Sequence, residues 1–269
     1  MPLDAALLNL GQLDRLAGRR TLVHGLDPRA KVAATTAFIL ATVSMPKHEL
    51  APLMPLFLFP VVMASLAEVP LRFLAKRVAL VSPFALFVGM FNPFFDTAVA
   101  GVLLGVPISG GWLSFASILV KFSLTVSAAL LLIATTSFPG VCQALRDLGA
   151  PPLFVSQLLF LHRYLFVLLE EAMRMSRARE LRAFGGQGLG MRVAGRIIGV
   201  LFIRTVERSE RIYRAMLCRG FHGDIPVGRR HRPGWPDLLF LALTAGWLFA
   251  CRFLPLTHMA GRLAQGVLS

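Results

Sequence analysis

The chain has 269 residues, of which 56% are apolar and only 16% are charged, and its mean hydropathy is +0.68. Ordinary soluble domains carry about 25% charged residues, so this composition excludes such a domain and is typical of an integral membrane protein. The formal net charge of +14 would also suit a nucleic-acid-binding protein. In a membrane protein, however, an excess of Lys and Arg first indicates cytoplasmic loops and anionic lipid headgroups. We therefore expect a lipid bilayer, and no nucleic acid, among the partners.

Five apolar stretches approach the roughly 20 residues that a membrane-spanning helix needs. The second of them contains several prolines, which predict an irregular or kinked helix. The sequence therefore predicts an all-α integral membrane fold with about five transmembrane helices. The stretches cover approximately residues 30–47, 50–69, 75–95, 113–137 and 236–256.

The distribution of positive charge predicts the orientation in the membrane. With the N-terminus inside, five Lys and Arg residues up to position 31, three at 72–77 and sixteen between 138 and 232 all face the cytoplasm, which is 24 of the 28 in the chain. The loop at 96–112 has none. Cytoplasmic loops are enriched in Lys and Arg, so we expect a cytoplasmic N-terminus and an external C-terminus.

The segment 138–232 is too long for a simple connection and, in its second half, too charged to span a membrane. It predicts a cytoplasmic helical insert with a short helix over 139–150, a long helix over about 153–183 and a third over about 191–219. The first part of the long helix is apolar enough to lie against or partly within the membrane. The expected organisation is thus 1–137 for the N-terminal segment and four transmembrane helices, 138–232 for the insert, and 233–269 for the last transmembrane helix and tail.

The chain lacks the residue patterns of common energy-converting and metal sites. No G-x-x-x-x-G-K-[ST] sequence is present, so a P-loop for nucleotide phosphates is not expected. The six histidines are scattered, and the three cysteines form no C-x-x-C pair and are interpreted as small apolar residues. We expect no cofactor, no resident metal and no catalytic activity, so that energy for uphill transport would come from a partner.

One charged side chain, Lys121, lies well inside a predicted span. A charge within the membrane is costly and is often functional. Two interpretations stay open at this point: a structural placement of the amine, or a contact with another subunit.

A first motif, Leu26-Asp27-Pro28-Arg29-Ala30-Lys31, stands at the start of the first predicted span. Asp27 suits the N-cap, Pro28 suits the first helical position, and Arg29 and Lys31 suit lipid headgroups. Capping stabilises a helix by roughly 1 kcal/mol, which is enough to explain Asp27. The alternative is a contact of this motif with a partner.

Two similar motifs stand near the C-terminal ends of the two long insert helices. The first is Ala178-Arg179-Glu180, and the second is Cys218-Arg219-Gly220, in which Gly220 suits the C′ position. Arginine near a helix C-terminus is favourable by about 0.3–1 kcal/mol through the helix dipole. The dipole effect easily explains one helix end that carries an arginine, but it explains less well why two helices of the same insert end in similar motifs. A contact of both motifs with partners is therefore the competing hypothesis.

These motifs, together with the stretch RSERIYRAMLCRGFHG at 208–223, resemble the transmembrane T component of energy-coupling-factor transporters, most closely the cobalt-importer version, CbiQ. The resemblance covers nearly the whole chain in motif order and membrane layout. It implies a bacterial cytoplasmic-membrane subunit whose partners are a pair of ABC-type ATPases, a membrane substrate-binding subunit and a small accessory membrane subunit.

The resemblance also implies that Arg179 and Arg219 dock into grooves of the two ATPases. The chain departs from the family pattern at Glu180, where Gly or Ser is common, and at Cys218, where Ala is common. Arg177 and Arg182 are close competitors of Arg179 for the docking role.

The expected function is therefore mechanical coupling of ATP hydrolysis to cobalt uptake, and the same role for nickel or a vitamin is the alternative. A stand-alone carrier would need intramembrane polar residues and repeat symmetry. A lipid-modifying membrane enzyme would need clustered acids, bases or metal ligands. Neither pattern is visible in the sequence.

Overall fold

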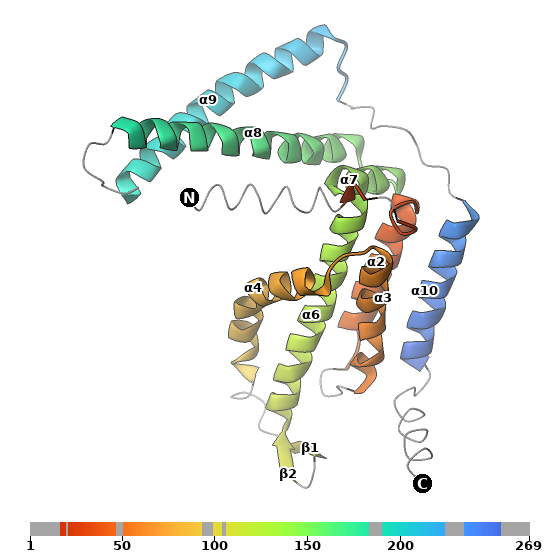
Figure 1. Cartoon of the computed structure of the whole chain (residues 1–269). Helices are drawn as coiled ribbons and strands as arrows, with labels where there is room; N and C mark the ends of the chain where they lie inside the picture. The colour runs from red at the N-terminus through yellow and green to blue at the C-terminus, as the bar shows by residue number, and fades with distance from the viewer. Residues whose placement is uncertain are drawn as a thin grey trace. The chain divides into compact units, whose positions relative to one another are not determined.

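The structure is a computed structural model that describes residues 17–19, 21–46, 51–92, 99–103, 106–182, 190–223 and 234–253. The described residues are predominantly helical, which confirms the all-α membrane fold, and a short two-stranded hairpin is added to the helices (Figure 1). The described elements fall into two compact units, one containing α2 to α6 and α10 and the other containing α7 to α9. The predicted turn at residues 47–49 and the predicted helix stop at Gly185 and Gly186 lie outside the described residues.

The elements follow the chain in the order in which the sequence predicts them. Their bounds are α2 Pro28–Val43, the 3-10 turns η1 Ala51–Leu53 and η2 Pro55–Phe57, α3 Leu58–Leu66, α4 Leu71–Gly89, β1 Val99–Leu103, β2 Val106–Ser109, α6 Gly110–Thr136, α7 Phe138–Asp147, α8 Pro152–Arg182, α9 Met191–Cys218 and α10 Trp235–Phe253.

Three described helices, α6, α8 and α10, are long and apolar enough to cross a membrane. The other predicted spans coincide with shorter or more polar helices. Helix α2 has 16 residues, the proline-rich second stretch breaks into 3-10 turns before α3, and α4 begins with the charged positions 72, 76 and 77. Helix α8 belongs to the first of these groups because it has 31 residues and its first half is apolar, as the sequence indicates.

In the membrane unit, α2 packs against both α6 and α10, and α4 packs against α6 (Figure 1). The Phe38 ring of α2 stacks on Phe59 of α3 with centroids 4.4 Å apart. Gly89, at the end of α4, allows a close approach to α6, because a Cβ there would lie 2.8 Å from the Phe115 ring. Small residues at such positions let membrane helices approach one another closely.

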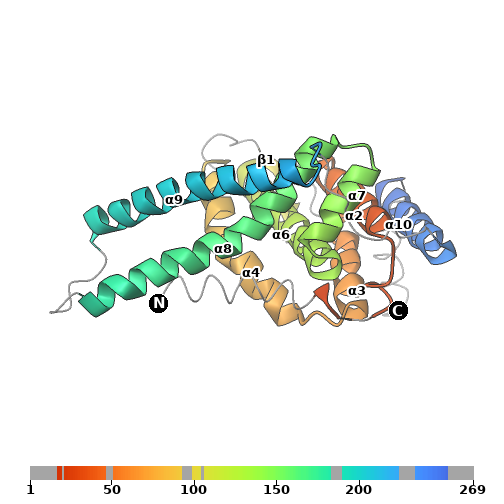
Figure 2. The ribbon, with the colours of Figure 1, turned by 90° about the horizontal axis from the view of Figure 1, so that it is seen from above.

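The second unit contains α7, α8 and α9. The short helix α7 is followed by Gly149 with φ +101°, as predicted for its end. Helices α8 and α9 are 31 and 28 residues long, run antiparallel and cross each other (Figure 2). None of the residues of α9 is buried, so this helix presents most of its surface outward.

Between α4 and α6, β1 and β2 form an antiparallel pair in which Val99 is opposite Ser109 and Leu103 is opposite Val106. The sequence indicates only a loop over this part of the chain. Apolar and β-branched residues such as Val99 and Val106 favour a strand locally.

Candidate functional site

The first motif forms the N-terminus of α2, where Asp27 has the predicted capping role. Its carboxylate accepts a hydrogen bond from the Arg29 backbone N–H at 2.8 Å, and Pro28 occupies the first helical position. The Asp27 backbone N–H in turn donates to Oδ1 of Asp237 at 2.7 Å. Asp27 is therefore both a helix cap and a buried link to α10.

Lys31 differs from the expectation, because it does not reach toward lipid headgroups. The side chain is 2% exposed, and its Nζ donates to the Thr135 carbonyl at 3.0 Å and to the His24 carbonyl at 3.5 Å. Thr135 lies in the last turn of α6, where backbone carbonyls lack intrahelical partners. An ammonium group satisfies such carbonyls well, so Lys31 is drawn into the protein.

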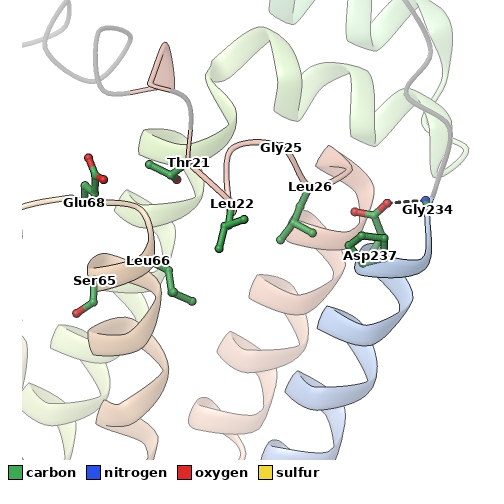
Figure 3. A pocket seen from close by; sticks show the side chains of 10 residues that line it. Thr21, Leu22, Gly25, Leu26, Ser65, Leu66, Glu68, Gly234 and Asp237 are labelled. Atoms are coloured by element: carbon green, nitrogen blue, oxygen red, sulfur yellow. Dashed lines mark hydrogen bonds between the residues drawn. The ribbon is translucent and has the colours of Figure 1, made fainter.

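Asp237, in the first turn of α10, is a site residue that the sequence analysis missed. Its Oδ2 accepts a hydrogen bond from the Gly234 backbone N–H at 2.7 Å, as Figure 3 shows. Asp237 is 7% exposed and, with Leu26 and Glu68, it borders a cavity of about 920 Å³. An acidic residue at the start of an otherwise apolar span is the signal that would have found it.

At the C-terminal end of α8, Ala178 and Arg179 are half-buried, whereas Arg177 and Glu180 are exposed. Four arginines and one glutamate from α8 and α9 border a groove of about 430 Å³ at this end. Its lining is Glu171, Arg174, Met175, Ala178, Arg179, Arg182 and Arg204. Arg179 thus belongs to a positively charged groove, together with its competitor Arg182, whereas the exposed Arg177 does not border that groove.

At the C-terminal end of α9, Gly220 adopts φ +77°. Its N–H donates to the Leu217 carbonyl, and the Phe221 N–H donates to the Met216 carbonyl, both at 3.0 Å. This pair of bonds is a Schellman motif with glycine at C′, as predicted. Arg219 is the C-cap residue and is exposed.

Cys218 is a free cysteine and is exposed. It stands in the last turn of a helix that is not packed on both sides. The other two, Cys142 and Cys251, are buried as expected, and burial raises the pKa of the Cys142 thiol above its ordinary value.

Contacts between α8 and α9 fix where the two arginine motifs stand. Arg204 of α9 pairs with Glu171 of α8 at 2.8 Å, and the Phe221 ring lies 6.5 Å from that of Phe160 on α8. The Cys-Arg-Gly end is therefore near the first half of α8. From Phe160 to Arg179 the helix rises about 28 Å, so the structure holds the two motifs apart instead of bringing them together.

Comparison with known proteins gives relatives over much of the chain. An uncharacterized protein of Methanocaldococcus jannaschii is 30% identical over 235 residues, which cover 82% of this chain and 78% of the relative. The cobalt transport protein CbiQ of Salmonella typhimurium is 34% identical over 101 residues, covering 37% and 44%. The nickel permease LarQ of Lactiplantibacillus plantarum is 29% identical over 122 residues, covering 45% of each.

The model of one protein family, described as cobalt transport protein and named CbiQ, matches residues 19–230. That match contains the helix-start motif and both arginine-bearing helix ends described above. The chain therefore belongs to the CbiQ family of cobalt transport proteins.

Proposed function

We propose that this chain is the coupling subunit of an ATP-driven importer of the energy-coupling-factor type. It would link a pair of ABC-type ATPases to a membrane substrate-capture subunit, with a small accessory membrane subunit as a further partner. The chain itself would carry out no chemistry. In this proposal α8 and α9 receive the movement of the ATPases and pass it to the capture subunit, which then releases its cargo inside.

The observation that carries the proposal is the pair of arginine-bearing helix ends held far apart on two crossing helices. Two well-separated ends suit two ATPase subunits, one for each end. A planar guanidinium can make bidentate, charge-assisted hydrogen bonds to a carboxylate. At the α9 end, Arg219 is exposed between Cys218 and Gly220, whose small size would let the helix end enter a groove.

The same contacts support a lever mechanism. The pair between Arg204 and Glu171 joins the two helices near their crossing, and the Ser156 hydroxyl donates to the Gly223 carbonyl at 3.4 Å beyond the end of α9. Force applied at Arg219 would therefore reach the first half of α8 through packed side chains and hydrogen bonds. Force applied at Arg179 would act on the opposite end of the same helix.

The proposed cargo is cobalt ion, since the family description names cobalt. Nickel is the second candidate, favoured by the similarity to the nickel permease LarQ. Uptake of labelled cobalt by cells expressing the complete importer, with nickel as competitor, distinguishes them. Preferential uptake of cobalt supports cobalt as the cargo. Uptake of nickel without cobalt would identify nickel as the cargo instead.

The proposed location is the bacterial cytoplasmic membrane with the N-terminus in the cytoplasm. The concentration of Lys and Arg in the segments assigned to the inside supports this orientation, because 24 of 28 lie there. The insert with α8 and α9 would then be on the side where ATP is available.

Protection of Cys218 tests the docking proposal directly, because this thiol is exposed and adjoins Arg219. A maleimide reagent should label Cys218 rapidly in the isolated chain and much more slowly when the ATPases are bound. The buried Cys142 and Cys251 should react slowly in both states and serve as internal controls. Equal labelling of Cys218 in an assembled complex would contradict docking at this end, and failure of any ATPase to assemble would favour a stand-alone carrier.

A further inference from the structure

Two cations from other helices converge on the C-terminal end of α2. The Lys121 ammonium of α6 donates to the Met45 carbonyl at 2.6 Å and to the Val43 carbonyl at 3.4 Å. Arg252 of α10 donates to the Ser44 carbonyl at 3.1 Å, and the same nitrogen lies 3.5 Å from the Met45 sulfur. Together the two cations therefore contact three consecutive residues, Val43, Ser44 and Met45.

The carbonyl groups at the end of α2 need hydrogen-bond donors from other helices, because the last turn of α2 itself supplies few. A helix leaves its last four carbonyls without intrahelical partners. The last turn of α2 contains no basic residue, and its C-cap residue Ser44 has right-handed helical geometry. The cations that favour a helix C-terminus are supplied here by α6 and α10.

The opposite end of α2 is tied to the same two helices. There the Asp27 backbone N–H donates to Asp237 of α10, and Lys31 donates to the Thr135 carbonyl of α6. Fourteen residues separate Lys31 from Met45, and fourteen separate Lys121 from Thr135. Both intervals correspond to about 21 Å of helix, so the two sets of contacts are matched along antiparallel α2 and α6.

We infer that Lys121 and Arg252 are positioning residues that complete a polar clamp at the two ends of α2 and join α2, α6 and α10 into one rigid frame. This assigns Lys121 the structural role that the sequence left open beside a subunit contact. Movement during transport would then occur around this frame and not between its three helices. The inference holds whichever ATPase or cargo the importer uses.

The test uses the purified full-length chain in lipid nanodiscs, with spin labels on the exposed positions 40 of α2 and 249 of α10. Lys121→Met and Arg252→Leu should each lower the melting temperature by about 5 °C, and the double variant should broaden the distance distribution between the labels. Lys121→Arg should have a melting temperature close to that of the parent, because a guanidinium can reach the same carbonyls. Lys76→Met, on the exposed side of α4, is the matched control and should change neither property.

Unchanged melting and unchanged label distances in the double variant would overturn the clamp. So would a Lys121→Met chain that melts like the parent but no longer co-purifies with the capture subunit, since Lys121 would then be a partner contact. A Lys121→Arg chain that melts at as low a temperature as Lys121→Met would also contradict the inference. The loss would then reflect side-chain packing and not the hydrogen bonds to α2.

Discussion

Lys31 is a buried cation whose electrostatic balance depends on groups from other helices. It lies within electrostatic range of both Asp27 and Asp237 and is 2% exposed. Asp237→Leu removes one of these two carboxylates and also leaves the backbone N–H groups of Asp27 and Gly234 without their acceptor, and each unsatisfied buried group costs about 1–3 kcal/mol. We therefore expect Asp237→Leu to reduce the free energy of unfolding by an amount of that order, measured by denaturant titration in detergent.

The double variant Lys31→Met with Asp237→Leu is the control for this prediction. It removes the buried ammonium together with one carboxylate, so its loss should be smaller than the sum of the two single losses, although the Asp27 and Gly234 N–H groups still lack an acceptor. Additive losses in the double variant would show that the two side chains are not coupled.

The roles of Asp27 and Lys31 differ in how far the sequence could predict them. Capping by Asp27 is local, because its carboxylate meets a backbone N–H two residues away, and the Asp-Pro pattern encodes it. The burial of Lys31 depends on Thr135, 104 residues away, and on Asp237. No local pattern carries that information, so a headgroup role was the natural expectation.

At the scale of elements, the end of α9 depends on the conformation of one residue. Gly220 has φ +77°, where a Cβ costs roughly 1–2 kcal/mol. Gly220→Ala should therefore fray the last turn of α9, displace Arg219 and weaken ATPase pull-down. Gly199→Ala, in the helix interior with open space around the new methyl group, is the matched control and should stabilise α9 by up to about 1 kcal/mol. Equal pull-down by the two variants would contradict a precise role for this helix end.

The long insert helices were well predicted, and the second transmembrane stretch is irregular, as its prolines indicate, although its helix is shorter than the predicted span. Helix α8 was expected over about 153–183 and occurs at Pro152–Arg182, because prolines and charge changes mark its limits in the sequence. In the second stretch, Pro52, Pro55 and Pro60 compete with a strong apolar pattern, and the outcome is two 3-10 turns and a nine-residue helix. Proline removes backbone donors, but where the chain resumes a helix depends on tertiary packing.

At the scale of the whole molecule, the orientation gives a direct prediction. Single cysteines placed at 97–111 and near the C-terminus should react with a membrane-impermeant reagent in intact cells, whereas a single cysteine placed at 185–190 should react only after the cells are opened. The reason is the concentration of Lys and Arg in the segments assigned to the cytoplasm. Labelling of the C-terminal probe only in opened cells would indicate an even number of spans and contradict the proposed layout.

The helical membrane fold and the order of the helices could be predicted from the sequence, because hydropathy and helix-end residues are local signals. It could not predict that α2 is tied at both ends to α6 and α10, since these contacts join residues up to 210 positions apart. Nor could it show that Arg179 borders a groove with Arg204 of α9. That arrangement exists only once α8 and α9 cross.

The central claim is that the two arginine-bearing helix ends couple this chain to its ATPases. The most direct measurement compares Arg179→Ala, Arg219→Ala and the double variant for detergent pull-down of the ATPases and for cobalt uptake, at matched expression. Arg214→Ala is the control, because Arg214 is exposed and pairs only weakly with Glu210 at 3.5 Å. Arg204 does not serve as a control, since it joins α9 to Glu171 of α8.

Each single variant should stay folded and keep part of its activity, because one end can partly compensate for the other. The double variant should lose assembly or transport, since a charge-assisted contact at the centre of an interface contributes about 2 kcal/mol or more. The control should behave like the parent. A double variant that assembles with the ATPases and imports cobalt like the parent would contradict the account, and Arg179 and Arg219 would then be helix-end residues with no coupling role.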